Sequence, residues 1–401
     1  MNKRIYMLII GALMILIIWN GCKKPYNPQI ISVPNNYLVV EGFINSGADS
    51  TIFSLSRTVN LDNKVTVNPE LNAQVTIEND QNNIYPLTEA PDGKYFIAGL
   101  TLNQTQKYRL RIKTVSSNEY VSDFVPVLNS PPIDSVSYTI KSDGVDFSVN
   151  THDPNNNTRY YRWDYGETWI FHANFFSQFK SNGDTVLFRD LQNDQIYQCW
   201  QHDTSSTITL GSSAKLTSDV ILNQPLTSVS STSEKFTTRY SILVRQSALT
   251  SSAYSFWQNL KKNTEQLGSI FDAQPSQIGG NIHSTTNPNE PVIGYLSAGA
   301  TSVKRIYINN IQLPNWLPTP FYTDCKIVPA CCYFVYVPPN THDQPINQEN
   351  LFFNVNKGSN QLIPVTSIGL PGQPPIGHTG TTPECADCTL RGTNKQPAFW
   401  K

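Results

Sequence analysis

Tyr160-Tyr161-Arg162-Trp163-Asp164-Tyr165 is the stretch of this chain that best indicates its fold. It follows a turn-forming run of Asp, Pro and Asn at residues 153–157, and aromatic sequence continues beyond it to Phe171. Alternate side chains of a strand point to opposite faces, so the odd-numbered aromatic residues of an unbroken strand lie together. The segment therefore predicts a long strand with one aromatic face towards a core, formed by Tyr161, Trp163, Tyr165, Trp169 and Phe171.

The far end of this segment has a second interpretation. Gly166 is able to mark a bulge that turns the residues beyond it outwards. Exposed aromatic rings bind sugars or peptides, or anchor a protein interface. The alternative to a core face is therefore a surface binding patch, and its members would be Tyr165, Trp169, Phe171, Phe175 and Phe176.

Short alternating runs surround this strand and predict a mainly β protein with tandem sandwiches. Residues 37–128 predict an Ig-like or transthyretin-like sandwich, because short strands with turn signals follow one another from Val75 to Ile112. The Asn-Ser-Pro-Pro run at 129–132 is a linker. Residues 133–310 predict a second, fibronectin III-like domain with one inserted helix near 251–267, which Thr250 or Ser251 caps. The loop at 271–281 is a further recognition candidate.

Composition favours the same class. Charged residues make up 15% of the 401 residues, against roughly 25% in an average domain, and the formal net charge is −1. No basic block favours nucleic acid as a partner. The 27 prolines and 21 glycines suit many short strands joined by turns. About 380 residues follow position 21, which is more than one core holds.

The cysteines predict a stapled C-terminal region at 311–401. An even number in an exported chain predicts three disulfides, with 15 connectivities open. The alternative is a zinc site built from the Cys-Ala-Asp-Cys motif and the Cys-Cys pair, but an oxidising compartment favours disulfides. No βαβ pattern supports a thioredoxin-like role. The six residues are Cys199, Cys325, Cys331, Cys332, Cys385 and Cys388.

The N-terminus predicts a lipoprotein signal peptide at residues 1–21. Lys3 and Arg4 precede an apolar run that ends at Trp19, and Gly21 precedes Cys22. We expect the thiol of Cys22 to be acylated and residues 22–36 to form a Pro-containing tether. An uncleaved anchor is the alternative, and both interpretations give a protein held on a membrane.

The chain offers no convincing catalytic, metal or cofactor site. The six histidines are scattered, and neither an HExxH nor a GxSxG motif is present. The Asp/Asn-rich run at 153–157 lacks a full calcium ligand set and is interpreted as a turn. Glu41, Asp164 and Glu167 could form a carboxylate pair, but hydrogen bonding and ion pairing with Arg162 or Arg245 is the preferred interpretation.

Several segments together resemble the Bacteroidota outer-membrane lipoprotein family catalogued as domain of unknown function 4249 (DUF4249). The resemblance runs from about Cys22 to Trp400. It is carried by 38–42, 55–58, 160–169, 240–246, 256–257, 268–275, 280–282, 294–295, 385–388 and 397–400.

The resemblance implies an outer membrane lipoprotein, lipid-anchored through Cys22, and a partnership with a TonB-dependent receptor. Display on the cell surface is implied as well, although Lys23 and Lys24 follow the cysteine where acidic residues are common. The expected role is a non-enzymatic accessory, lid or substrate-capture subunit for a glycan, peptide or metal chelate. A structural or adhesive surface protein and a glycan- or peptide-cleaving enzyme are the alternatives.

Overall fold

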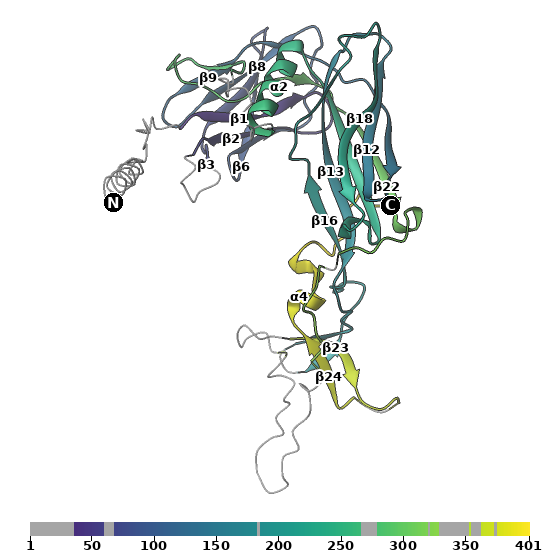
Figure 1. The fold of residues 1–401 in the computed structure, drawn as a ribbon. Helices are drawn as coiled ribbons and strands as arrows, with labels where there is room; N and C mark the ends of the chain where they lie inside the picture. Colours follow the sequence, from purple (N-terminus) through teal and green to yellow (C-terminus); the bar gives the residue numbers. More distant parts are fainter. Residues whose placement is uncertain are drawn as a thin grey trace, which may run out of the picture.

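The computed structural model describes residues 36–59, 68–182, 185–265, 279–319, 321–328, 353, 362–372 and 375–401. The predicted signal peptide and Cys22 lie outside these residues. The protein is mainly β, as predicted, with two sandwiches and a smaller distal lobe. The second sandwich and the lobe form one elongated column, and the first sandwich lies beside its upper end (Figure 1).

The first sandwich packs two sheets on an apolar core. One sheet runs in the order β21-β1-β2-β7-β6, with β3 beside β2. The other runs β20-β9-β8-β4-β5, with β10 beside β8. Alternating burial, as in β8, directs Tyr108, Leu110 and Ile112 into the core. The strands are β1 (Leu38–Asn45), β2 (Thr51–Arg57), β3 (Asn68–Pro69), β4 (Gln74–Asn79), β5 (Ile84–Pro86), β6 (Thr88–Ala90), β7 (Lys94–Ile97), β8 (Lys107–Lys113), β9 (Glu119–Ser122), β10 (Val125–Pro126), β20 (Ile282–Ser284) and β21 (Ala298–Gly299).

Two strands of the first sandwich come from a distant part of the sequence. β20 pairs antiparallel with β9, and β21 pairs parallel with β1. We expected residues 133–310 to form one domain. In the structure, the part of this range that contains β20 and β21 belongs instead to the first sandwich. Such short strands bury few side chains, and their sequence does not indicate which sheet they join. Residues 291–297 are mostly irregular, with a single bridge at Ile293 before β21.

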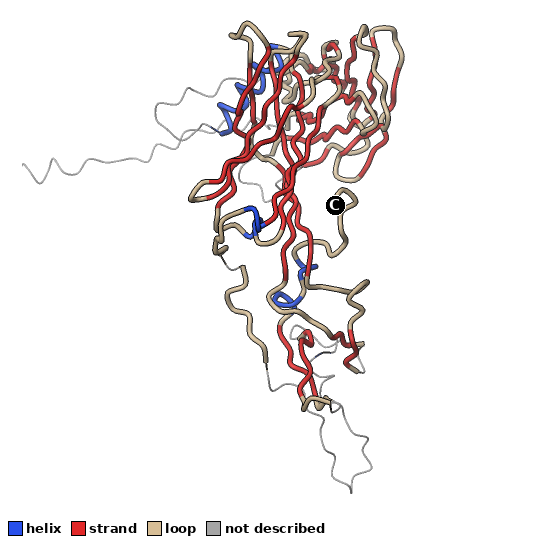
Figure 2. The backbone as a smooth tube through the Cα atoms, turned by 90° about the vertical axis from the view of Figure 1, so that its right-hand side faces the viewer, coloured by secondary structure: helices blue, strands red, loops and turns tan. Residues whose placement is uncertain are grey.

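The second sandwich packs a three-stranded sheet, β11-β12-β18, on a larger sheet in the order β16-β13-β19-β22, with β17 beside β13 (Figure 2). Its long central strand is the aromatic segment that the sequence singled out. The elements are β11 (Ile133–Ile140), β12 (Gly144–Asp153), β13 (Tyr160–His172), β16 (Gln198–Thr204), β17 (Thr209–Ser212), β18 (Asp219–Ser230), η1 (Glu234–Phe236), β19 (Arg239–Ala248), β22 (Ser302–Asn309) and η2 (Asn310–Gln312).

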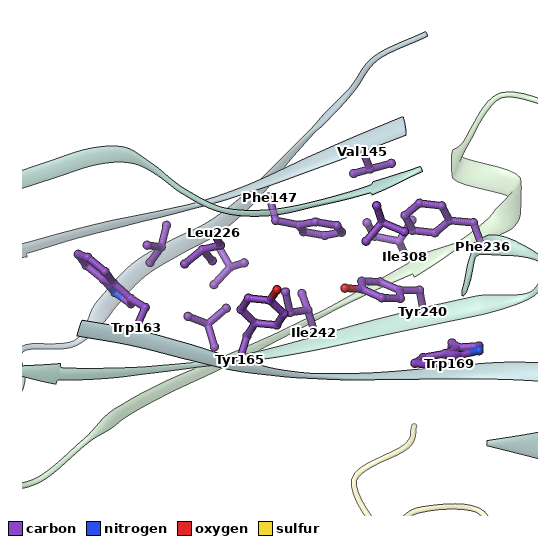
Figure 3. Packing of buried hydrophobic residues seen from close by; sticks show 14 of the residues in the cluster. Val145, Phe147, Trp163, Tyr165, Trp169, Leu226, Phe236, Tyr240, Ile242 and Ile308 are labelled. Carbon is purple, nitrogen blue, oxygen red and sulfur yellow. The ribbon is translucent and has the colours of Figure 1, made fainter. Parts of the chain in front are cut away.

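The core of the second sandwich contains the predicted aromatic face of β13. Figure 3 shows Trp163, Tyr165 and Trp169 in one apolar cluster with side chains of both sheets. Trp163 is 1% exposed, and a Cβ atom at Gly211 would lie 2.7 Å from its ring, so that only glycine fits there. The indole N–H of Trp163 donates to the side-chain oxygen of Gln246 at 2.9 Å, which satisfies a polar group that burial would otherwise leave unpaired.

The distal lobe is joined to the second sandwich by a disulfide between Cys199 of β16 and Cys388. A second disulfide links Cys325 and Cys385. The two cysteines of the Cys-Ala-Asp-Cys motif thus have different partners, which excludes the zinc and redox interpretations for that motif. Cys331 and Cys332 lie outside the described residues. The elements of the lobe are β14 (Phe179–Ser181), β15 (Val186–Phe188), β23 (Ile363–Ile368), β24 (Gly377–Thr381), α4 (Pro383–Ala386) and η3 (Cys388–Leu390).

Candidate binding cleft between the sandwiches

A cleft of about 650 Å³ lies between the two sandwiches. Its walls are the outward faces of two strands, because Val39, Glu41 and Phe43 of β1 alternate with core residues, and Arg162 and Asp164 of β13 alternate with the aromatic core face. The helix α2 (Ser251–Glu265) stands beside both sandwiches and forms the third wall (Figure 1). Since strands of both sandwiches and a helix supply these walls, the cleft is part of the fold.

The helix begins where the sequence predicted, and its aromatic residues attach it to both sandwiches. Thr250 caps it, accepting a hydrogen bond from the backbone N–H of Ala253 at 3.1 Å. Tyr254 packs on Tyr160 of β13, with ring centroids 5.0 Å apart. Phe256 packs on Tyr295 of the first-sandwich segment, with ring centroids 5.3 Å apart. Most of the predicted recognition loop at 271–281 lies outside the described residues.

Arg162 is the most unusual residue of the cleft. Its guanidinium carbon lies 3.9 Å from the ring centroid of Trp257, in a cation–π contact. Among the described residues, no carboxylate forms an ion pair with Arg162 and no acceptor takes a hydrogen bond from its guanidinium. Burial lowers the pKa of Arg162, and the charges of Asp164 and Glu41 oppose this shift. The cleft therefore holds a half-buried cation whose donors have no partner among the residues that the structure describes.

The neighbouring charges are arranged differently. Arg245 of β19 donates to the carboxylate of Asp164 at 3.0 Å, as the ion-pairing interpretation predicted. The carboxylate of Asp164 is therefore paired with Arg245 and not with Arg162. Glu41, on the opposite wall, is exposed. The cleft thus contains Arg245, which is paired with Asp164, and Arg162, which has no ion-pair partner among the described residues. Glu41 makes its rim acidic.

The backbone of β1 also contributes to the cleft. Residues 293–298 run beside it and are joined at both ends, from the N–H of Val40 to the carbonyl of Ile293 at 2.8 Å and from the N–H of Ile44 to the carbonyl of Ser297 at 3.0 Å. Within the described residues, no backbone hydrogen bond joins Gly42 to this segment. The ladder is therefore interrupted at Gly42, which lines the cleft.

The structure corrects the predicted aromatic patch. Three of its five members are core residues, because β13 continues past Gly166 in regular register with β19 and β16 instead of bulging. Tyr165, Trp169 and Phe171 are 8%, 6% and 0% exposed. Phe175 is half-buried, and Phe176, 40% exposed, packs on Tyr197 towards the distal lobe. None of the five lines the cleft.

Glu167 does not form a carboxylate pair with Asp164 or Glu41. It lies on the core side of β13, whereas Asp164 faces outwards and Glu41 belongs to the other sandwich. Its carboxylate accepts hydrogen bonds from the ammonium of Lys235 and the hydroxyl of Tyr240, each at 2.6 Å. Burial and the charge of Glu167 raise the pKa of Tyr240. Glu167 is thus a satisfied buried anion that stabilises the sandwich.

The Asp/Asn-rich run forms a turn. The carboxylate of Asp153 accepts backbone hydrogen bonds from Asn155, Asn157 and Thr158 at 2.8 to 3.0 Å. Within the described residues, no group of three His, Cys, Asp or Glu side chains is arranged to hold a metal ion. In the same residues, no helix has the length and apolar character needed to cross a membrane.

Sequence reasoning missed the role of Arg162 and Trp257. The sequence assigned Arg162 to ion pairing and placed Trp257 within the predicted helix near 251–267. The parity of β13 does place Arg162 on the outward face, and this signal was available. What stands against that face depends on the docking of α2 and of the other sandwich, which local sequence does not show.

Comparisons with known structures give only distant likenesses. A two-domain fibronectin type III segment of chicken tenascin matches at 11% identity, covers 53% of this chain and 92% of its own length, and has a TM-score of 0.16. The chitinase ChiA74 from Bacillus thuringiensis matches at 14% identity over 51% of this chain and 30% of its own, with a TM-score of 0.15. The Yersinia pseudotuberculosis adhesin InvE matches at 12% identity over 54% and 55%, with a TM-score of 0.12. Scores this low assign neither a function nor a ligand.

A family model gives a clearer result. No curated protein matches this chain. The model described as "Domain of unknown function (DUF4249)" matches residues 23–305. This range includes the first sandwich, every wall of the cleft and the second sandwich up to the middle of β22. The resemblance noted from the sequence extended further, to Trp400. The match covers well over half of the sequence, and the chain therefore belongs to the DUF4249 family.

Proposed function

We propose that this protein is a non-enzymatic ligand-capture subunit, anchored to the outer membrane through Cys22, that delivers its ligand to a TonB-dependent transporter. The observation that carries this proposal is the interdomain cleft with its half-buried Arg162, which has no ion-pair partner among the described residues. Binding sites commonly form at domain interfaces, with apolar walls and a few placed polar groups. The family resemblance implies the membrane anchor and the transporter partner.

The non-enzymatic part of the proposal is supported by the chemistry of the cleft. Its carboxylates are Glu41, Asp49 and Asp164, and Asp164 is paired with Arg245. Proton transfer needs a group placed and tuned to give or take a proton. An arginine with free donors instead orients and holds an anionic ligand.

A structural or adhesive surface protein is the second candidate. It is favoured by the elongated column of the second sandwich and the distal lobe, held together by the Cys199–Cys388 disulfide (Figure 2). An adhesive role needs no transporter and no small ligand, so that the two candidates differ in what they bind.

The test is a gentle detergent pull-down from native outer membranes with a tag after the exposed Lys401, followed by mass spectrometry. We expect a TonB-dependent β-barrel in a fixed ratio to the acylated protein. A Cys22→Ser variant, which cannot be acylated, is the control for the anchor. Recovery of an acylated protein without any barrel would contradict the transporter partnership and favour adhesion.

A further inference from the structure

The unpaired guanidinium of Arg162 indicates what kind of group the cleft binds. A buried or half-buried charge without a partner costs free energy, and an incoming anion would relieve that cost. Arginine presents a planar fork of donors that matches a carboxylate with two parallel hydrogen bonds. The cation–π contact with Trp257 holds this guanidinium in place before a ligand arrives. An arginine held in this way is prepared to bind a carboxylate.

An apolar surface lies close to this cation. Phe43 and Ile52 form a cross-strand pair on the outward face of the first sandwich, and Ile52 is 50% exposed. Leu260 of α2 lines the same cleft from the helix side. The exposed isoleucine, the half-buried phenylalanine paired with it and the half-buried leucine line one cleft, where an apolar side chain of a ligand would cover them.

The interrupted ladder leaves the main-chain groups of Gly42 without a backbone partner in residues 293–298. A polar group of a bound peptide is able to pair with such main-chain groups. Gly294 keeps the neighbouring segment close to β1, because a Cβ atom there would lie 2.4 Å from the carbonyl oxygen of Val40. The gap in the ladder is thus confined to the part of β1 that lines the cleft.

The aromatic rings of the cleft do not favour a sugar. Arg162 lies over one face of Trp257. Phe256 packs on both Trp257 and Tyr295, with ring centroids 5.4 and 5.3 Å apart. A sugar ring binds best on an open aromatic face, and these faces are largely occupied by protein.

We propose that the cleft binds the C-terminal end of a short peptide. The terminal carboxylate pairs with Arg162, an apolar last side chain lies on Ile52 and Leu260, and a peptide amide bonds to the main chain of Gly42. The acidic rim at Glu41 and Asp49 suits a cationic group elsewhere on the peptide. This inference rests on the proposed capture role and names the ligand class for the same site.

The test compares a free carboxylate with its amide on the unmodified protein. The full acylated chain, in detergent, is titrated against a fluorescein-labelled pool of hexapeptides that end in Phe, prepared either as free acids or as C-terminal amides. We expect the free acids to bind roughly 10- to 100-fold more tightly by fluorescence anisotropy, as for a hydrogen bond to a charged group. This comparison needs no mutant and does not depend on the folding of a variant.

Two matched variants locate the effect. Arg162→Gln should weaken binding of the free acids by a similar factor and leave binding of the amides unchanged. Lys215→Gln removes the same charge from an exposed loop outside the cleft and should change neither. Equal binding of acid and amide, no binding of either at about 1 mM, or an acid preference that survives Arg162→Gln would each overturn the inference.

The outcome is separable from that of the transporter test. Carboxylate-dependent peptide binding without a co-purifying barrel would support the ligand class and contradict the partnership. A barrel without carboxylate-dependent peptide binding would support the partnership and overturn the ligand class.

Discussion

Gln246 joins several parts of the second sandwich. It is fully buried in β19, and its side-chain oxygen accepts the indole N–H of Trp163 at 2.9 Å. Its amide nitrogen donates to the carbonyl of Pro131 at 2.9 Å and to the hydroxyl of Thr151 at 3.0 Å. One side chain therefore ties the linker, β12 and β13 together. A buried amide is tolerated here because its partners satisfy it.

Replacing Gln246 with leucine should destabilise the sandwich. Gln246→Leu keeps the volume but leaves the indole N–H of Trp163 and the carbonyl of Pro131 buried without partners, at a cost of about 2–4 kcal/mol. Urea unfolding followed by tryptophan fluorescence measures the change. Gln81→Leu, in an exposed turn, should change the free energy of unfolding by less than about 0.5 kcal/mol. Equal effects of the two substitutions would contradict a structural role for the Gln246 amide.

At the residue scale, the sequence predicted which side chains are buried better than which residues they contact. Trp163 was expected in the core because of its parity, and it lies there. Tyr165 was assigned to either the core or a patch, and the regular pairing of β13 decided for the core. The contacts of Arg162 and Gln246 reach residues far away in the chain, such as Trp257 and Pro131, and no local pattern records them.

At the scale of elements, a charged ladder runs across the outward face of the sheet β9-β8-β4. Glu78 of β4 accepts hydrogen bonds from Arg111 at 2.6 Å and Arg109 at 2.7 Å, both on β8. Arg111 also contacts Glu119 of β9. Burial acts to raise the pKa of Glu78, but the hydrogen bonds and charges of the two arginines outweigh it and lower the pKa. The carboxylate therefore stabilises the folded state while it is ionised.

This ladder predicts a loss of stability in acid. A carboxyl group whose pKa is lower in the folded state stabilises above its unfolded pKa, and this contribution disappears as the pH falls through the folded pKa. We expect Glu78→Gln to lose about 1–3 kcal/mol at pH 7. Below about pH 4 the difference from the unmodified protein should shrink. Urea unfolding at pH 7 and at pH 3 measures this difference in the free energy of unfolding.

A surface carboxylate provides the matched control for the ladder. Glu384 is exposed in the distal lobe, and Glu384→Gln should have little effect at either pH. If the effect of Glu78→Gln were the same at pH 7 and at pH 3, ionisation of Glu78 would not be the source of the stabilisation.

Alternating strands were predictable, and irregular ones were not. The alternating sequences Lys107–Lys113 and Thr51–Arg57 form β8 and β2. β16 was missed because its sequence, Gln-Cys-Trp-Gln-His-Asp-Thr, is mostly polar. β23 and β24 were missed because proline and glycine interrupt them, and partners in the lobe complete them. In such segments, tertiary contacts outweigh the strand propensity of the sequence.

At the scale of the whole molecule, the Cys199–Cys388 disulfide holds the end of the chain on the second sandwich. Both cysteines are fully buried, and the bond joins residues 189 positions apart. Beyond it, Trp400 packs on Trp200 and Tyr307, and it covers the side of β13 that faces away from the core, at Ile170. Closing a long loop restricts the unfolded chain strongly, and such bonds typically contribute about 2–5 kcal/mol.

Removing this bond should loosen the C-terminal segment. In a Cys199→Ser/Cys388→Ser variant we expect faster tryptic cleavage at Arg391 and Lys395 and earlier unfolding in urea. A Cys325→Ser/Cys385→Ser variant removes a bond that does not involve a sandwich strand, so its main unfolding transition should stay close to that of the unmodified protein. Mass spectrometry of the fragments identifies the cleaved bonds. Similar cleavage of both variants would contradict a special role for Cys199–Cys388.

The edge strands between Ile282 and Asn309 impose an order on how the molecule can be made. As the chain emerges N-terminus first, residues up to Pro126 contain all of the first sandwich except β20 and β21. The second sandwich likewise lacks its edge strand β22 until the same stretch appears. Both sandwiches therefore have unpaired edge strands until residues 282–309 have emerged. Unpaired edges are sites of mispairing. That segment supplies the missing strands of both sandwiches, so we expect the two domains to complete their folding together and not one after the other.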